Sequence, residues 1–593
     1  MMAAALALRL TGVATDYPWY WYPDRDISVH ARECINTAHP KLDPGEYIYP
    51  TAYIYLNAAV YALVGVAAVG TGLVHGMHGL GELYFSKFGF LMAVTRVVGT
   101  LLSVIMIWMV ARVVRRVAGE LAGVLAAVAL AFAWLDVVCC HYPTADVPSA
   151  IMLLAAAIYA LRLYEKKAGP WDYVVGGLIA GAGMASKYPA GAGMMSLVVA
   201  HWLALRRDRE VGDPEAAEGR PGLWAGWAIV VGATAAGFLI LCPWAIVSWP
   251  AFFTDMLYQR MYNACGPEKP WRLGAFLFTM TPQGGMGLPL TVAALVGFGW
   301  MVAKKRREAA ILLVGAICVW LAYAGTRRFI DRWYETLMPF MAIGAGLGVA
   351  CVARALLGRW RVAAIAAACA IMAACVAKPA LYEVRYDQIL LEPGTRRAAT
   401  AYVLDKIPAG ARVVLGQYAW AGPDVPHEKY QVEWMIPGSP EGLYTGLTLK
   451  QMLEGSFGAR VKRFSPSAYE KLEAREEAYL AGGEALESLV PKLPEKAEWA
   501  VVNTEAMAHA IESAPKEFTP VPGKPYSSFQ ALLEEGYGQM LLDLHNREIT
   551  EEPFVAGERD RHPWGTWPYG SPRIVIYHLH PGKPAGAADE LPK

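Results

Sequence analysis

Long apolar runs separated by short charged loops occupy the first two thirds of the chain. A helix needs roughly 20 apolar residues to cross a hydrocarbon core of about 30 Å, and ten runs approach that length. Residues 1–12 resemble the last turns of one more span, so the pattern predicts about eleven transmembrane helices. The ten runs are 88–111, 119–137, 147–163, 172–187, 190–205, 224–246, 275–302, 309–325, 333–353 and 362–377.

Lysine and arginine are concentrated in alternate loops between these runs. Positive charges in short loops favour the cytoplasmic side, so the pattern predicts a cytoplasmic N-terminus and an extracytoplasmic C-terminus. The loop at 326–332 is an exception, because it is basic and falls on the outer side. The predicted cytoplasmic clusters are Arg112, Arg115 and Arg116; Arg162, Lys166 and Lys167; Arg206, Arg207, Arg209 and Arg220; Lys304, Lys305, Arg306 and Arg307; and Arg354, Arg359 and Arg361.

One further segment, residues 47–74, is apolar enough to cross the membrane. A crossing there would invert every later loop and place the basic clusters outside. We therefore predict a helix that lies on or dips into the outer interface, within a first outer loop at 13–87. Its tyrosines suit that position: Tyr47, Tyr49, Tyr53, Tyr55 and Tyr61.

The hydropathy pattern changes after residue 377. Residues 395–407 resemble an amphipathic helix, and the apolar stretches near 413 and 500 and at 572–579 indicate strands. The stretch 466–498 is rich in Glu, Lys, Ala and Leu and is predicted to be helical. The predicted fold class is thus a polytopic α-helical membrane domain, 1–377, followed by an extracytoplasmic mixed α/β domain, 378–593.

Composition supports burial in a membrane. The chain is 55% hydrophobic and 18% charged, against about 25% charged for a soluble domain, and its mean hydropathy is +0.29. The net charge of +1, without a basic stripe interleaved with aromatics, argues against nucleic acid as a partner. All nine cysteines lie at or before Cys375 without metal-ligand spacing. No cofactor is assigned, and a divalent metal stays open.

The predicted topology brings several ionisable residues to the outer surface, where charged groups at span ends are costly and often functional. A carboxylate can deprotonate an acceptor hydroxyl, and Lys and Arg can hold a phosphate. Each residue also has a plain interpretation, namely a helix cap, a headgroup contact or a solvated charge. A metal-ligand interpretation of His141 has little support. The residues are Asp24, Arg25, Asp26, His141, Asp146, Lys187, Arg327, Arg328, Asp331, Arg332 and Glu335.

Several stretches, taken in order, resemble the dolichyl-phosphate-mannose–protein mannosyltransferase superfamily of GT-C glycosyltransferases, which includes the aminoarabinose transferases. The similar stretches are YPDRDISVHAREC, TRVVGTLLSVIMIWMVARVVRRVAG, HYPTADVPSAIMLLAAAIYAL, GGLIAGAGMASKYPAGAGM, RRFIDRWYETLMPFMAIGAG and EPGTRRAATAYVLDKIPAGARVVL. This resemblance covers roughly residues 1–415, plus the final strand SPRIVIYHL.

The resemblance implies an inverting transferase that moves a sugar from a polyprenyl-phosphate donor to a lipid, glycan or protein acceptor outside the cytoplasmic membrane. It implies Asp24 as catalytic base. The chain has Arg25 where the family usually has Glu, which leaves Asp26 as a second candidate. Asp146 corresponds to the second-loop acidic position, and Lys187 and Arg332, with Arg328 beside them, to donor phosphate-binding positions. The alternatives are a flippase of a lipid-linked sugar and an inactive member that binds glycan or protein.

Overall fold

The structure is a computed structural model of the whole chain. It describes residues 2–14, 26–36, 39–86, 88–165, 168–211, 219–264, 285–304, 306–326, 331–358, 360–391, 394–416, 423, 425–434, 453, 456–480, 493–503, 539–540, 542–544, 547, 554–556 and 573–580. The chain forms two compact units, the first ending at Leu391 and the second beginning at Glu392, with Met256–Lys269 and Tyr20–Pro23 also assigned to the second. The predicted limit at 377 stays a prediction.

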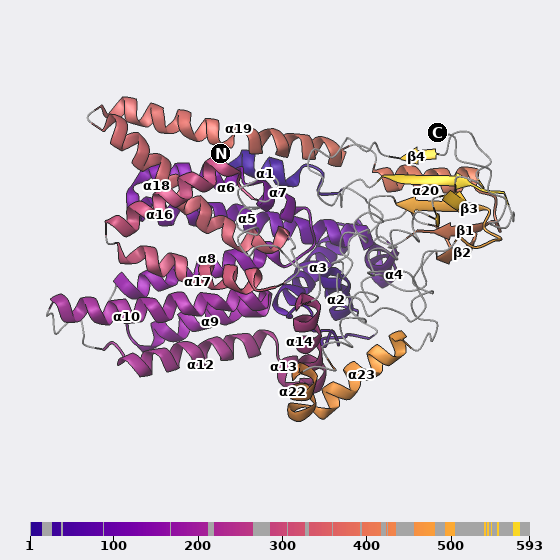
Figure 1. Cartoon of the computed structure of the whole chain (residues 1–593), viewed down its shortest axis with the longest axis horizontal. Coiled ribbons are helices and arrows are strands. Elements are labelled where there is room, and N and C mark those ends of the chain that lie inside the picture. The colour runs from indigo at the N-terminus through magenta and orange to yellow at the C-terminus, as the bar shows by residue number, and fades with distance from the viewer. Residues whose placement is uncertain are drawn as a thin grey trace. The chain divides into compact units, whose positions relative to one another are not determined.

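The first unit is helical (Figure 1). Its elements up to the middle of the chain are α1 Met2–Leu10, α2 Asp26–Cys34, α3 Ala52–Gly70, α4 Gly76–Gly81, the π-helix η1 Glu82–Ser86, α5 Phe88–Ala118, α6 Glu120–Ala131, α7 Trp134–Cys140, α8 Asp146–Glu165, α9 Pro170–Ser186, the 3-10 helix η2 Tyr188–Ala192 and α10 Gly193–Val211. The later ones are α12 Leu223–Leu241, α13 Trp244–Val247, α14 Trp249–Ala264, α16 Leu288–Ala303, α17 Arg307–Ala324, the 3-10 helix η3 Asp331–Leu337, α18 Met338–Leu357 and α19 Arg361–Leu391. Helix α14 belongs to the first unit only as far as Asp255.

Each of the eleven predicted spans contains a helix. By length and composition, eight helices among the described residues can cross a membrane, or nine if α6 and α7, which meet at 55°, form one broken span. The chain is therefore a multi-pass membrane protein. Three predicted spans fall short of this criterion, because α1 and α9 are short and α16 is described only from Leu288.

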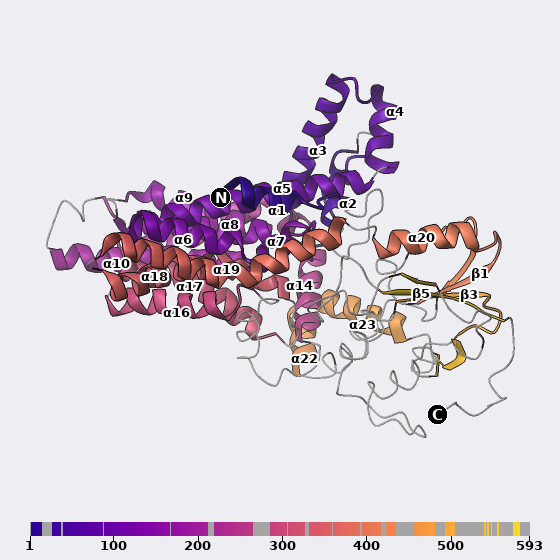
Figure 2. The same cartoon turned by 90° about the horizontal axis from the view of Figure 1, so that it is seen from above.

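Helix α3 passes the same length test, which does not distinguish a crossing from a surface position. Figure 2 shows α3 running across the direction of the other long helices and away from them. This arrangement supports the predicted interfacial helix, which stays a prediction. Two of its tyrosines do not face an interface as expected: Tyr53 and Tyr61 are buried against α5, where their hydroxyls contact the backbone carbonyl and the hydroxyl of Thr95, respectively.

Glycine lets the membrane helices approach closely, as the composition of the runs suggests. In α9, a Cβ on Gly181 would lie 2.3 Å from the carbonyl oxygen of Thr234 in α12. In α16, a Cβ on Gly297 would lie 2.0 Å from the carbonyl oxygen of Gly344 in α18. Any larger residue at these positions would push the paired helices apart.

Contacts among the basic loops show that they meet at one end of the helices. Arg116 at the end of α5 pairs with Glu165 at the end of α8, and Arg307 at the start of α17 pairs with Glu210 near the end of α10 at 2.5 Å. Arg354 near the end of α18 donates to the carbonyl of Ala118. The other ends of α8, α9 and α18 therefore lie together at the opposite end of the bundle.

The second unit contains a five-stranded sheet in the order β2-β1-β3-β5-β4. Strand β1 pairs in parallel with β2 and β3, β5 pairs antiparallel to β3, and the edge strand β4 pairs antiparallel to β5. Helix α20, Thr395–Lys406, packs its apolar side on the sheet around Val403. The strands are β1 Arg412–Leu415, β2 Gln431–Trp434, β3 Trp499–Asn503, β4 Phe554–Ala556 and β5 Ile574–His578, with helices α22 Ser456–Phe464 and α23 Pro466–Leu480. A mixed α/β domain is thus confirmed for the part of the C-terminal region that the structure describes.

Candidate functional site

Three of the predicted residues come from three different helix ends. Asp146 is the first residue of α8. Lys187 follows the last residue of α9, where the backbone leaves the helix for an extended conformation before η2. Arg332 is the second residue of η3, the short turn that leads into α18. These are the ends opposite the basic loops, so the three side chains meet there.

Their contacts form one buried ionic cluster. The Lys187 ammonium donates to Oδ1 of Asp146. The Nε of Arg332 lies 3.9 Å from Oδ2 of the same carboxylate, which also accepts a hydrogen bond of 2.7 Å from the Thr144 hydroxyl. The side chains of Asp146, Lys187 and Arg332 are only 3%, 12% and 11% exposed.

Such a cluster is suited to an anionic ligand. Two cations beside one carboxylate can hold a phosphate if the ligand replaces part of the internal ion pairing, and in a poorly hydrated site each contact is stronger than in water. Asp146 keeps Lys187 and Arg332 oriented while no anion is bound. The carboxylate is also placed at the N-terminus of α8, where the helix dipole stabilises negative charge.

The first outer loop is anchored next to Lys187. The hydroxyl of Tyr188 donates to the carbonyl of Tyr47 at 2.7 Å, and the hydroxyl of Tyr47 donates to Asp43 at 2.6 Å. Asp43 also accepts hydrogen bonds from the Gly45 N–H and the Ser248 hydroxyl. Burial alone would raise the pKa of Asp43, but these hydrogen bonds outweigh it and lower that pKa below its ordinary value.

A second buried ion pair lies near this cluster. Arg9 of α1 donates through Nε to Oδ2 of Asp136 in α7 at 3.0 Å, and the same oxygen accepts a hydrogen bond of 2.6 Å from Ser103. Both charged side chains are fully buried. The remaining guanidinium hydrogens point to backbone carbonyls of α1 and α6, so this pair fastens α1 to the bundle.

Among the described residues, the other predicted site residues are not seen in this cluster. Asp26 begins α2, which packs on α3 and α5, and Asp24 and Arg328 lie outside the described residues. His141 is buried, with both ring nitrogens directed at backbone carbonyls. In the part of the chain that the structure describes, no group of three His, Cys, Asp or Glu residues is arranged to hold a metal ion.

Arg9 and Asp136 were not predicted from the sequence. Arg9 falls in the short N-terminal stub, and Asp136 falls near the end of the run 119–137. The available signal was that an ionisable residue inside an apolar run is costly and usually has a partner. The partner itself could not be identified, since it lies more than a hundred positions away in the sequence.

The helical bundle and its buried polar cluster define a multi-pass membrane protein with an anion-suited site at one end. The profile of the family "Dolichyl-phosphate-mannose-protein mannosyltransferase" matches residues 80–214. This segment contains Asp146 and Lys187. The match confirms the resemblance to the GT-C mannosyltransferase superfamily within this segment.

Solved structures of similar fold include ArnT from Cupriavidus metallidurans bound to undecaprenyl phosphate, at 13% identity over 97% of this chain and 96% of that chain, with a TM-score of 0.43. They also include the Archaeoglobus fulgidus oligosaccharyltransferase tethered to an acceptor peptide, at 14% identity over 85% and 69%, with a TM-score of 0.43. Similarity at this level does not define a reaction. No curated protein matches the sequence.

Proposed function

We propose that the chain is an inverting glycosyltransferase that moves a sugar from a polyprenyl-phosphate donor to an acceptor on the outer face of the cytoplasmic membrane. The observation that carries this proposal is the buried cluster of Asp146, Lys187 and Arg332 at the end of the helices opposite the basic loops. Under the positive-inside rule that end faces outward.

In the proposed reaction, a carboxylate of the first outer loop, Asp24 or Asp26, removes the proton of an acceptor hydroxyl. The acceptor oxygen forms a bond to the anomeric carbon from the face opposite the phosphate. The bond between that carbon and the phosphate oxygen breaks, and its electron pair leaves with the polyprenyl phosphate. Lys187 and Arg332, with Arg328, would bind this phosphate and stabilise its developing charge.

The test measures donor binding and sugar transfer separately, with polyprenyl-phosphate-linked hexoses and pentoses as donors. We expect Asp24→Asn or Asp26→Asn to lower transfer by about 10² to 10⁴-fold, as loss of a general base does, while donor binding is kept. Lys187→Met and Arg332→Met should weaken donor binding itself. Arg307→Gln, which breaks an ion pair at the other end of the helices, is the matched control and should retain both.

The possible outcomes separate the alternatives. Full transfer activity in both the Asp24 and Asp26 variants would exclude these residues as the base. Donor binding without turnover by any acceptor fraction would favour an inactive, glycan-binding protein. Movement of the lipid-linked sugar across a vesicle membrane without transfer would favour a flippase. The glycan that is lost from the cell envelope upon gene deletion would identify the acceptor.

A further inference from the structure

Glu335 is a carboxyl group that the proposed reaction does not use. It lies on η3 one 3-10 turn after Arg332, so both side chains project along the same edge of that turn. Its side chain is fully buried. Among the described residues, neither of its oxygens has a hydrogen-bond donor.

The nearest acidic neighbour of Glu335 is incompletely satisfied as well. In Asp136, Oδ2 accepts hydrogen bonds from Arg9 and Ser103, whereas Oδ1 has no donor among the described residues. The Glu335 and Asp136 carboxyls are close enough to hydrogen-bond to each other once one of them carries a proton.

Simple energetics then favour one shared proton. An ionised carboxylate without a donor in a dry interior is strongly unfavourable, and two ionised carboxylates side by side repel each other. Asp136 has a counter-ion in Arg9, whereas Glu335 has no hydrogen-bond donor among the described residues. A proton on Glu335 lets its carboxyl group donate a hydrogen bond to Asp136 and removes the charge that has no counter-ion.

We propose that Glu335 is a proton-holding residue that makes binding of the donor phosphate depend on pH. With its proton, Glu335 adds no charge to the site. When Glu335 has lost its proton, a further negative charge lies near Asp146 and Arg332, and the site repels the phosphate. This inference rests on the proposed function, since it assigns a regulation to the same phosphate site.

Other ionisable groups do not substitute for Glu335 in this role. Arg9 is already paired with Asp136, and α18, which follows η3, has no acidic, basic or thiol side chain before Cys351. The ionisable groups that surround Glu335 are Arg9 on α1, Asp136 and Cys140 on α7, Asp146 on α8, Arg332 on η3 and, beside Lys187, Tyr323 on α17.

The experiment measures binding of undecaprenyl phosphate to the purified full chain in lipid nanodiscs over a pH series. Wild type should lose affinity toward alkaline pH by at least about tenfold relative to Glu335→Gln, which carries no charge at any pH. Comparing the two proteins with the same ligand cancels the titration of the ligand phosphate. The matched control is Glu383→Gln, because Glu383 is also fully buried without a donor among the described residues, but its ionisable neighbours are Arg9, Asp136 and Asp387 rather than Asp146.

A second measurement uses the wild-type protein alone, so it does not depend on whether a variant folds. Calorimetry at alkaline pH in buffers of different ionisation enthalpy should show that wild type takes up about one proton per phosphate bound, beyond the ligand's own titration. Wild type and Glu335→Gln with the same pH dependence, or Glu383→Gln with the same effect as Glu335→Gln, would overturn the inference alone. Absence of undecaprenyl phosphate binding at every pH, in every protein, would instead overturn the proposed function.

Discussion

At the scale of single residues, His141 shows how burial sets a protonation state. Its Nδ1 lies 2.9 Å from the carbonyl oxygen of Val137, and its Nε2 lies 2.8 Å from that of Thr11. A neutral ring can donate to only one of them. Burial nevertheless lowers the pKa of His141 to about 4, despite the raising effect of these carbonyls, and the charges of Arg96 and Arg9 lower it further.

This lowered pKa predicts a loss of stability in mild acid. The unfolded chain takes up the proton near pH 6.5, whereas the folded chain does so only near 4. The stabilisation is therefore complete above about 6.5 and falls as the pH decreases toward 4, reaching a loss of about 1 kcal/mol near pH 5.5. Thermal unfolding should show this slope in wild type and a smaller slope in His141→Gln. Equal slopes in the two proteins would contradict the assignment.

Residues at span ends could be predicted, while those inside spans could not. Asp146, Lys187 and Arg332 each follow or precede an apolar run, so the topology alone predicts that they share a surface. Their contact is a matter of helix order, which the structure supplies. The sequence also contains Glu335, but its lack of a donor among the described residues depends on how α7 approaches η3, which no periodicity encodes.

At the scale of elements, the predicted helices were found because apolar length is a direct signal of a span. The break between α6 and α7 was not predicted. The run 119–137 reads as continuous, yet α6 ends at Ala131 and α7 continues at 55° to it. Arg9 donates to Asp136 in α7 and to the carbonyls of Leu130 and Ala131 at the end of α6, so the buried ion pair lies at the break.

Helix α3 carries an apolar face that no described residue covers. Leu63 and Val66 are 68% and 73% exposed, and Leu56 and Val69 continue the same side of the helix. The opposite side holds Tyr53 and Tyr61 against α5. Exposed apolar surface of this extent indicates contact with lipid.

If α3 lies in the outer interface, a fluorophore on Leu63→Cys, in a background without other cysteines, should be quenched by lipids brominated near the headgroup. Quenching by lipids brominated at the chain end should be weaker, because an interfacial helix enters the membrane only about 5–10 Å. A label on Lys406→Cys in α20 serves as the control and should not be quenched. The strongest quenching at the chain end would show that α3 crosses, which would invert the predicted topology.

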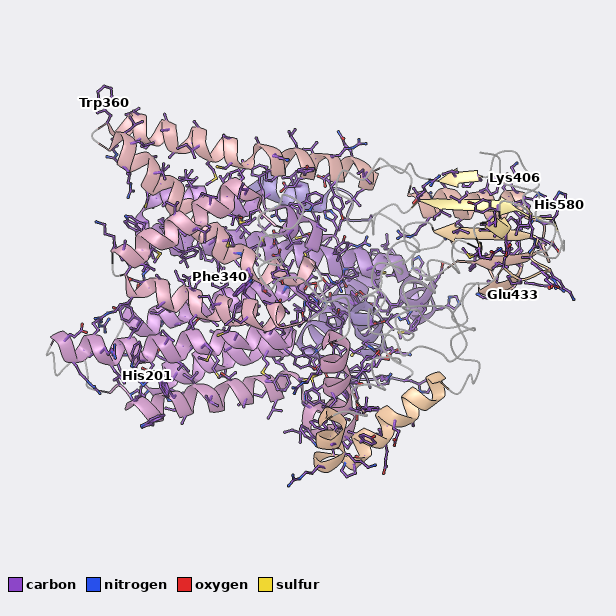
Figure 3. The ribbon with its side chains drawn as sticks, in the orientation of Figure 1. His201, Phe340, Trp360, Lys406, Glu433 and His580 are labelled. Carbon is purple, nitrogen blue, oxygen red and sulfur yellow. The ribbon has the colours of Figure 1, made fainter. Side chains whose placement is uncertain are left out.

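At the scale of the whole molecule, the basic loops and the buried ionic cluster lie at opposite ends of the helical bundle. The basic loops meet at one end of the bundle, and Trp360 marks that end in the turn between α18 and α19 (Figure 3). The cluster of Asp146, Lys187 and Arg332 lies at the other end of the same helices. A helix such as α8, with 20 residues, spans about 30 Å, so the two ends face opposite sides of a bilayer.

The positive-inside rule then predicts which side each end faces, and a thiol-labelling experiment tests it. In a background without native cysteines, Glu433→Cys on the exposed edge strand β2 should react with a membrane-impermeant maleimide in cells whose cytoplasmic membrane is intact (Figure 3). Trp360→Cys, which is 61% exposed, should react only after that membrane is permeabilised. The reverse result would place Lys187 and Arg332 on the cytoplasmic side, where the proposed transfer to an outer acceptor cannot occur.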